Sequence, residues 1–167
     1  MPDLQNLAVA ACLVFALLAG TGRAACTDPA APQVDWRRCT LDGGDFAGRD
    51  LAGADIEEAS FGFADLSRAD LADSRGFNAK FVDGRLAGAR FDRARLNEAD
   101  FTGADLAGAT FRGADLRRAR FFHARLAAAD FTGAQLAGTD FLGADLAGAL
   151  WTDGRHRCAA GSVGACN

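Results

Sequence analysis

A five-residue period dominates the chain between Trp36 and Trp151. Every fifth residue in this stretch is large and apolar, with Gly76 as the one gap, and the residue two places earlier is usually alanine. The period matches neither the two-residue repeat of a strand nor the 3.6-residue repeat of a helix. A short period held over such a length is typical of a solenoid, in which each unit buries its apolar face by stacking on the next unit. The period therefore predicts a rod of stacked coils rather than a globular core.

Several units share a more specific sequence, in which alanine and aspartate precede the large apolar residue: Ala54-Asp55-Ile56, Ala64-Asp65-Leu66, Ala99-Asp100-Phe101, Ala104-Asp105-Leu106 and Ala144-Asp145-Leu146. These units resemble the A-(D/N)-(L/F)-x-x repeat of the pentapeptide-repeat family, and the resemblance covers residues 36–155. It implies an all-β fold, a right-handed quadrilateral β-helix solenoid of about six coils with four units per coil. The central residue and the small residue would point inward. At about 4.8 Å between stacked strands the rod would be roughly 28 Å long.

A coil of twenty residues would stack residues twenty apart into columns. The aromatic central residues then form two opposite internal columns, one of Phe81, Phe101, Phe121 and Phe141 and the other of Phe91, Phe111, Phe131 and Trp151. Each buried ring contributes roughly 1.5–3 kcal/mol of hydrophobic stabilisation. We interpret these eight residues as a core ladder rather than as a ligand-binding box.

Two local features break the regular pattern. Gly76 at a central position leaves a hole between Ile56 and Leu96, and we expect a bulge that turns the ring of Phe77 inward to fill it. Glycine often follows the central residue by two places, where a type II turn needs a positive φ. A different corner turn is expected where a larger residue replaces that glycine, at Arg68, Arg93, Glu98, Arg118 and His123.

The N-terminus has the features of a secretory signal peptide. An apolar run from Leu7 to Ala19 is too short to span a bilayer but suits a signal sequence, and Gly22 and Ala24 are small residues suited to cleavage after Ala24. We therefore expect a signal peptide at residues 1–24 and a lead-in and N-terminal cap at residues 25–35. The mature protein would be periplasmic or secreted, with no stable membrane span.

Four cysteines would remain after cleavage, and they lie only at the two ends of the repeat array: Cys26, Cys39, Cys158 and Cys166. An even number of cysteines in a small exported chain is typical of disulfides. Three connectivities are possible, and Cys26–Cys39 with Cys158–Cys166 is favoured because the rod would hold its two ends too far apart for a bridge. The second disulfide would pin the tail, residues 156–167. Free thiols are an alternative, and a metal site using His156 lacks a fourth ligand.

Charged residues just before the central positions suggest ion pairing along the rod. Five of these residues in succession are basic: Arg75, Lys80, Arg85, Arg90 and Arg95. In a twenty-residue register they fall into columns with acidic residues, which predicts surface ion-pair ladders such as Asp65, Arg85, Asp105, Arg125 and Asp145. Lys80, Asp100, Arg120 and Asp140 would form another. With a net charge of −4, the chain is not expected to bind nucleic acid.

One outward column is apolar rather than charged. Val82, Thr102, Phe122 and Leu142 each follow a central residue on the same side of the predicted rod. Such a stripe is a candidate surface for a partner or for self-association. The alternative is scattered surface hydrophobic residues, which are normal on soluble proteins.

No residue pattern indicates catalysis. His123 and His156 have no paired nucleophile, and neither a P-loop nor a dinucleotide motif occurs, so we expect neither an enzyme nor a cofactor or metal. The sequence favours a non-enzymatic binding or structural module of the bacterial envelope, built as a disulfide-capped rod, with an unknown protein partner or self-association. The resemblance offers an alternative, because some family members are cytoplasmic DNA mimics that bind DNA gyrase. Those proteins have strongly acidic surfaces, unlike this chain.

Overall fold

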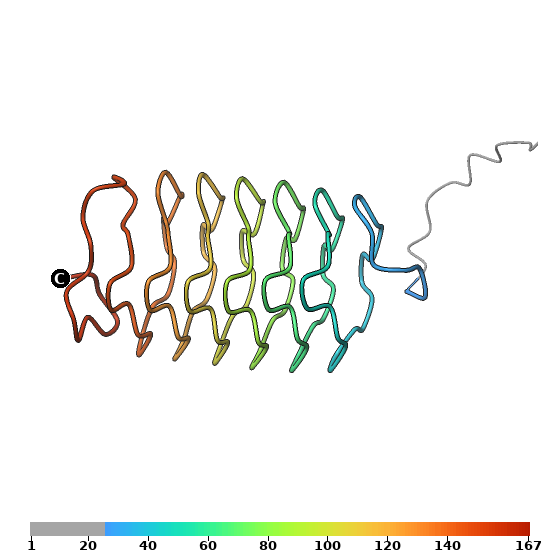
Figure 1. The fold of residues 1–167 in the computed structure, drawn as a ribbon, viewed down its shortest axis with the longest axis horizontal. Coiled ribbons are helices and arrows are strands. Elements are labelled where there is room, and N and C mark those ends of the chain that lie inside the picture. The colour runs from blue at the N-terminus through green and yellow to red at the C-terminus, as the bar shows by residue number, and fades with distance from the viewer. Residues whose placement is uncertain (1–25) are drawn as a thin grey trace, which may run out of the picture.

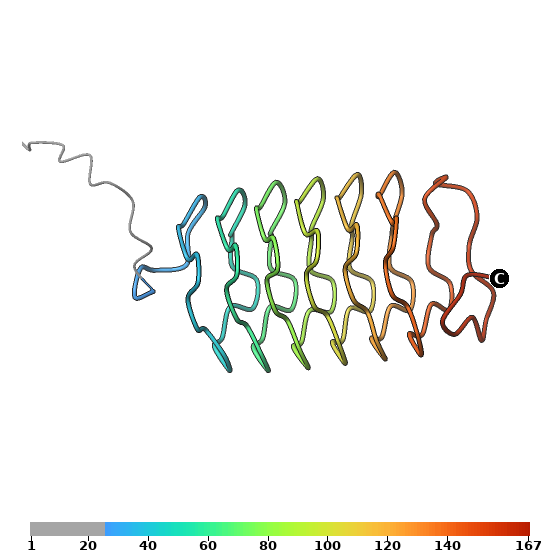
Figure 2. The same cartoon turned by 180° about the vertical axis from the view of Figure 1, so that it is seen from behind.

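The computed structural model describes residues 26–167, which form one elongated rod (Figure 1). Successive turns of the chain lie side by side along the long axis, and the C-terminus lies at one end (Figures 1 and 2). These residues contain no helix, and their only β-structure consists of isolated bridges. No helix able to cross a membrane therefore occurs between residues 26 and 167. The predicted signal peptide, residues 1–24, lies outside the described residues.

The coils repeat every twenty residues. Parallel bridges join residues twenty apart, beginning with Asp35–Asp55 and continuing to Asp130–Leu150. Four five-residue units therefore complete each coil and give the rod four faces. We number the faces in chain order from the central residue of each unit, so that Trp36 lies on face 1, Leu41 on face 2, Phe46 on face 3 and Leu51 on face 4.

Hydrogen bonds between coils follow one pattern in unit after unit. In the unit centred on Leu86, the N–H groups of Leu86 and Gly88 donate to carbonyls of the following coil at 2.7 and 2.9 Å, and that of Arg85 donates to the preceding coil at 2.9 Å. The N–H one residue after the centre is left over. An aspartate before the centre accepts it, as Asp100 does from Thr102 at 2.9 Å. This local bond explains why aspartate recurs at that position.

The corners share one backbone conformation whatever residue they hold. Every fifth residue from Gln33 to Gly148 has a positive φ, between 53° and 74°. The expectation of a different turn at the larger residues is therefore wrong, since φ is 58° at Arg68 and Arg93, 62° at Glu98, 60° at Arg118 and 56° at His123. Each corner N–H must meet a carbonyl of the next coil, and this ladder overrides the residue's own preference.

Aromatic rings stack in two columns inside the rod. The ring centroids of Phe81 and Phe101 lie 4.8 Å apart with nearly parallel planes, and Phe91 and Phe111 lie 5.2 Å apart on the opposite face. Rings of the two columns meet edge to face, as Phe101 and Phe111 do at 5.9 Å. All eight residues of the predicted core ladder occupy these columns: Phe81, Phe91, Phe101, Phe111, Phe121 and Phe131 are fully buried, and Phe141 and Trp151 are partly buried near the C-terminal end.

The predicted bulge at Gly76 is wrong. Gly76 occupies a regular central position with its N–H bonded to the carbonyl of Arg95 at 2.8 Å, and the Phe77 side chain is 38% exposed. A Cβ atom on Gly76 would lie only 2.9 Å from Leu96 Cδ2 and 3.3 Å from Ile56 Cγ1. The two neighbouring side chains already occupy the space, so no ring is needed there. A bulge would also break the inter-coil ladder.

At the N-terminal end, a disulfide joins Cys26 to Cys39, with their Cα atoms 5.3 Å apart. The side chain of Trp36 is 1% exposed, and its ring lies 5.3 Å from that of Phe46. The lead-in and the disulfide therefore cover part of the first coil. Leu41 remains only partly buried.

At the C-terminal end, the tail folds back over the last coil and is closed by the Cys158–Cys166 disulfide. Tail residues pair antiparallel with the coil beneath them, Arg157 with Leu150 and Val163 with Asp145. The tail thus adds extended chain over faces 4 and 3.

Candidate interaction face

Face 2 carries the apolar stripe that the sequence predicts. Val82, Thr102, Phe122 and Leu142 stack along the corner between faces 2 and 3, because the corner N–H of each coil bonds to the carbonyl of the stripe residue in the next coil. The side chain of Leu142 is 65% exposed, and the other three are half-buried. We call these four residues, together with Phe63 on the same corner, the apolar ridge.

Phe63 is the most exposed large apolar side chain of the ridge, at 71%. It occupies a corner position with φ of 58°, where Gly43 and Gly103 stand in other coils. Its N–H donates to the carbonyl of Val82 at 2.9 Å, which places the two residues side by side. A bulky residue in this conformation is strained, and its exposed ring gains little from burial. Neither property favours the fold, so the ring is a candidate contact residue.

An aromatic pair occupies the middle of the ridge. The rings of Phe122 and His123 lie 4.2 Å apart. The imidazole packs against Gly143 of the next coil, so closely that a Cβ atom on this glycine would lie only 2.4 Å from His123 Nδ1. Glycine at this position therefore leaves room for the ring beside Leu142. Phe122, His123 and Leu142 therefore lie next to one another on this corner.

A polar trough runs along face 2 beside the ridge. It encloses about 440 Å³ and is lined by two columns, Asn78, Glu98 and Arg118 on the corner between faces 1 and 2, and Lys80, Asp100 and Arg120 on face 2 itself. Ion pairs cross between coils in both columns, from Arg118 to Glu98 at 3.1 Å and from Arg120 to Asp100 at 3.2 Å. Lys80 forms no ion pair with any residue between 26 and 167.

The trough and the ridge are joined by Thr102. Its N–H and Oγ1 donate to the same oxygen, Oδ1 of Asp100, at 2.9 and 2.6 Å. On the far side of the trough, Phe77 lies on the corner beside Asn78 and is partly exposed. Face 2 thus places a polar hollow between exposed apolar groups. Such a combination of apolar contact area with polar and charged groups suits a protein partner.

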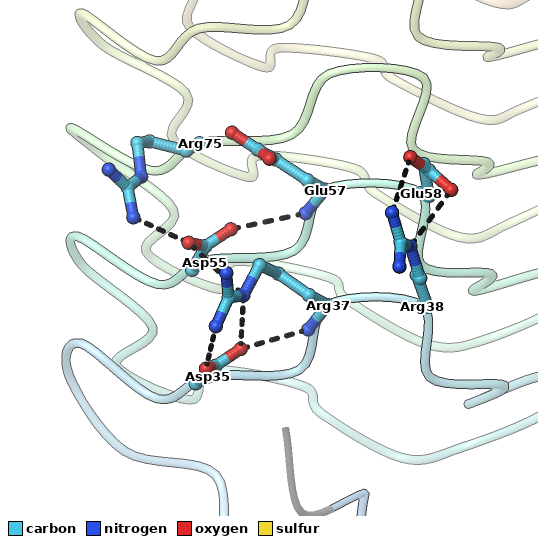
Figure 3. Close-up of polar contacts among 7 residues, drawn as sticks. All are labelled: Asp35, Arg37, Arg38, Asp55, Glu57, Glu58 and Arg75. Atoms are coloured by element: carbon cyan, nitrogen blue, oxygen red, sulfur yellow. Dashed lines mark hydrogen bonds and ion pairs between the residues drawn. The ribbon is translucent and has the colours of Figure 1, made fainter. Parts of the chain in front are cut away.

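The basic residues on the other faces are largely neutralised. Arg75 bonds to Asp55, and Arg90 to Asp70, in each case to the aspartate of the preceding coil (Figure 3 shows the first of these pairs). The predicted ladders exist as separate pairs of this kind. Arg125 lies 3.3 Å from Asp105.

Two further pairs lower the pKa of their carboxyl groups. The Arg93 guanidinium donates to both oxygens of Asp73, at 2.8 and 2.6 Å, and lowers the pKa of that carboxyl. Hydrogen bonds from Arg117 lower the pKa of Asp115 in the same way. Both arginines are well exposed, so solvent screens these pairs and they add little to the stability of the fold.

Sequence reasoning missed the trough and the exposed ring of Phe77. Part of the trough could have been predicted, because Asn78, Glu98 and Arg118 are polar residues spaced by twenty at one corner position. No group of three or more histidine, cysteine or acidic side chains within residues 26–167 could hold a metal ion.

The repeats match a known protein family. A family model described as Pentapeptide repeats matches the chain in eight copies, over residues 35–73, 77–113, 85–121 and 114–150. Among curated protein sequences, no match was found.

The chain is also similar to solved structures. One is HetL of the cyanobacterium Nostoc sp. strain PCC 7120, a pentapeptide repeat protein involved in heterocyst differentiation regulation, with 28% identity and a TM-score of 0.46. That match covers 73% of this chain and 63% of HetL, so the chain spans less than two thirds of that protein. Rfr23 of Cyanothece 51142 is 21% identical with a TM-score of 0.43, over 70% of this chain and 90% of Rfr23. A trypsin-treated form of QnrB1, a plasmid-mediated fluoroquinolone resistance protein, is 22% identical with a TM-score of 0.46, over 74% of each chain.

Proposed function

Because the chain belongs to the pentapeptide-repeat family, whose members fold as right-handed quadrilateral β-helices, we propose that it is a non-enzymatic binding module of the bacterial envelope. Its partner is a protein that docks along face 2. The observation that carries this proposal is the placement of the apolar ridge and the polar trough side by side on one face.

The charge distribution supports a protein partner on face 2. The trough contains both signs of charge in neighbouring coils, and its Lys80 makes no ion pair with the described part of the chain, so it suits a surface of mixed charge rather than a polyanion. The ridge supplies apolar area that a partner can remove from water, at roughly 25 cal/mol per Å². Buried Leu142 and Phe63 side chains would provide most of the affinity, and the trough would fix the register of the partner.

Export is supported by the cysteines and by the N-terminal sequence. Disulfides persist in oxidising compartments, and this chain uses Cys26, Cys39, Cys158 and Cys166 in two disulfides at the ends of the rod. The apolar run from Leu7 to Ala19 is typical of a secretory signal. We therefore propose that the mature protein acts in the periplasm or outside the cell.

The alternative, a cytoplasmic DNA mimic that binds gyrase, has less support. A DNA mimic needs a continuous acidic surface, whereas arginines pair with aspartates in successive coils of this rod, as Arg85 does with Asp65. These pairs remove much of the negative field that would imitate a phosphate backbone.

Site-specific photocrosslinking in the native host tests face 2. A photoreactive phenylalanine analogue is placed at Phe63 or at Leu142, and at Ala107 on the opposite edge of face 3 as the matched control. We expect one discrete crosslinked protein from the two ridge positions and none from position 107. The crosslink should disappear when Phe122 is replaced by aspartate. Crosslinks of equal yield from all three positions, or from none, would contradict a partner site on face 2.

The compartment is tested separately. Fractionation and intact-mass measurement of the protein from its host should give a periplasmic or secreted chain that begins near Ala25 and is four hydrogens lighter than its reduced form. An intact, reduced chain in the cytoplasm would refute the export part of the proposal and make a gyrase supercoiling assay the next experiment.

A further inference from the structure

The tail caps only half of the C-terminal end. On face 3, the N–H of Leu146 donates to the carbonyl of Ser162, and the N–H of Gly164 donates to the carbonyl of Ala144, both at 2.9 Å. On face 4, the N–H of Cys158 donates to the last coil and its carbonyl accepts from it, both also at 2.9 Å. These bonds continue the inter-coil ladder by one further layer on two adjacent faces. Faces 1 and 2 receive no such layer from the tail.

The uncapped half leaves backbone groups unpaired. Within residues 26–167, the N–H groups of Leu136, Gly138, Phe141 and Gly143 have no hydrogen-bond acceptor, although the corresponding groups of earlier coils all donate to the next coil. The side chains of Leu136 and Phe141 are only partly buried. Such an edge is a template for pairing with another extended chain.

The open edge also lacks the charges that usually protect an edge. Residues 134–143 contain a single charged side chain, Asp140, whereas the same positions of the preceding coil hold Arg117, Arg118 and Arg120. Two exposed apolar residues lie next to the edge, Leu142 on the corner of face 2 and Val163 in the tail, at 65% and 60% exposure. Charged side chains and proline are the common means of preventing edge pairing.

The outer edge of the tail has the complementary groups. The backbone N–H and C=O of Val163 make no hydrogen bond within the described residues, and the same holds for those of Arg157. In a parallel ladder, the N–H of one residue donates to the carbonyl of the residue before its opposite number on the other strand. Its own carbonyl accepts from the N–H of the residue after that opposite number. The rod uses this pattern itself, since Asp55 donates to the carbonyl of Val34 at 2.9 Å and accepts from the N–H of Trp36 at 2.8 Å.

We propose that this end of the rod is a self-docking surface for a second copy of the chain. A two-fold axis perpendicular to the rod, passing through the corner between faces 2 and 3, places the cap on faces 3 and 4 of one copy against open faces 2 and 1 of the other. The coils of the two copies then run in opposite directions. Each tail is antiparallel to its own coil and therefore parallel to the open edge that it meets, as the free groups require.

This geometry sets a specific register. Val163 of one copy lies opposite Asp140 of the other, where the carbonyl of Thr139 and the N–H of Phe141 have no hydrogen-bond partner among residues 26–167. Arg157 lies opposite Gln135. The two tails together make one shared layer between the rods, and the contact is isologous, so it closes at a dimer.

Charge substitutions at Val163 test the register with the purified, disulfide-bonded protein. Sedimentation equilibrium should show a dimer for the unchanged chain. Val163→Glu places a second carboxylate against Asp140 and should raise the dimer dissociation constant by roughly tenfold or more, whereas Val163→Lys should leave it within about threefold. The double variant Val163→Glu with Asp140→Lys should restore dimerisation. Ala87→Glu, with the same charge change on a corner in the middle of the rod, is the control.

Two results would overturn the proposal. The first is an unchanged chain that stays monomeric up to about 1 mM, the weak limit of specific association. The second is an equal effect of Val163→Glu and Val163→Lys, because Asp140 would then not be the opposing residue. Circular dichroism of each variant shows that the fold is kept, since Val163 is exposed and its substitution removes no internal hydrogen bond.

Discussion

Replacing Phe111 with alanine is the most direct test of which side chains face inward. The ring of Phe111 is completely buried and lies between those of Phe91 and Phe131, each 5.2 Å away and nearly parallel. Phe101 and Phe121 meet it edge to face at 5.9 and 5.7 Å. One substitution therefore removes contacts to four other rings. The neighbouring residue in sequence points outward and provides the comparison.

The structure predicts very different costs for the two neighbours. Truncating a buried phenylalanine to alanine costs about 3–5 kcal/mol, and the upper half of that range applies here because stacked backbones on both sides prevent the cavity from collapsing. The side chain of Arg112 is 62% exposed, so solvent screens its ion pair with Asp130 at 2.7 Å and the pair adds little to stability. Phe111→Ala should therefore lower the free energy of unfolding by about 3 kcal/mol more than Arg112→Ala does.

Urea unfolding followed by circular dichroism measures both variants against the unchanged chain. Coils in a solenoid interact only with their neighbours, so the gap left by Phe111→Ala should also broaden the transition as the two halves of the rod uncouple. Phe111→Leu serves as the matched control, because it keeps an apolar side chain in the column. Equal losses for Phe111→Ala and Arg112→Ala would refute the inward and outward assignment on which the faces are defined.

Three further outcomes are expected. Phe63→Gly should keep or raise the free energy of unfolding, by up to about 1 kcal/mol, because glycine relieves the left-handed corner and little packing is lost; a clear loss in urea unfolding would mean that the ring supports the fold. Because Arg93 lowers the pKa of Asp73 below its ordinary 3.8, and similar pairs recur, their stabilisation is present above that value and lost as pH falls through the lower folded pKa; an unfolding midpoint that stayed flat from pH 5 to pH 2 would contradict this. Reducing Cys158–Cys166 should release the tail, at a cost of about 2–4 kcal/mol to the last coil, and hydrogen exchange should then rise there but not in the middle of the rod.

The periodic part of the molecule was predictable because it follows from one constraint. A backbone that satisfies its hydrogen bonds between coils must repeat its inward positions in every coil, so the five-residue pattern and the twenty-residue register determine the aromatic columns. The disulfide pairs followed from the same register, since it separates Cys39 from Cys158 along the rod.

The corners and the fault at Gly76 were not predictable from local residue preferences. A large corner residue such as Glu98 prefers another turn when considered alone, yet its N–H bonds to the carbonyl of Arg117 at 3.0 Å and its φ is 62°. The same ladder keeps Gly76 in register and leaves Phe77 outside. In both cases a bond between coils, which no local window of sequence contains, outweighs a preference of about 1–2 kcal/mol.

For the candidate site, the sequence predicted only which residues stack in the same column. The apolar ridge follows directly from the register, because Val82 and Leu142 stand at equivalent positions three coils apart. The trough depends on how long side chains pair across coils. Arg120 pairs with Asp100 of the preceding coil rather than with Asp140 of the following one, and this choice of partner decides where the hollow lies. Sequence spacing allows either neighbour.

The inter-coil ladder also determines what kinds of contact each part of the rod can make. Along the sides, the central and corner N–H groups of one coil bond to the carbonyls of the next, so a partner on face 2 must rely on side chains such as Phe63 and Leu142 and on the charges of the trough. Binding there should depend on the residues of individual columns and weaken with salt. At the open half of the C-terminal end, the N–H groups of Leu136 and Phe141 have no acceptor among residues 26–167, so pairing there needs a parallel neighbouring chain and a compatible charge opposite Asp140. The two surfaces should therefore respond to different substitutions: Phe63→Gly should weaken partner binding without changing the dimer, and Val163→Glu should do the reverse.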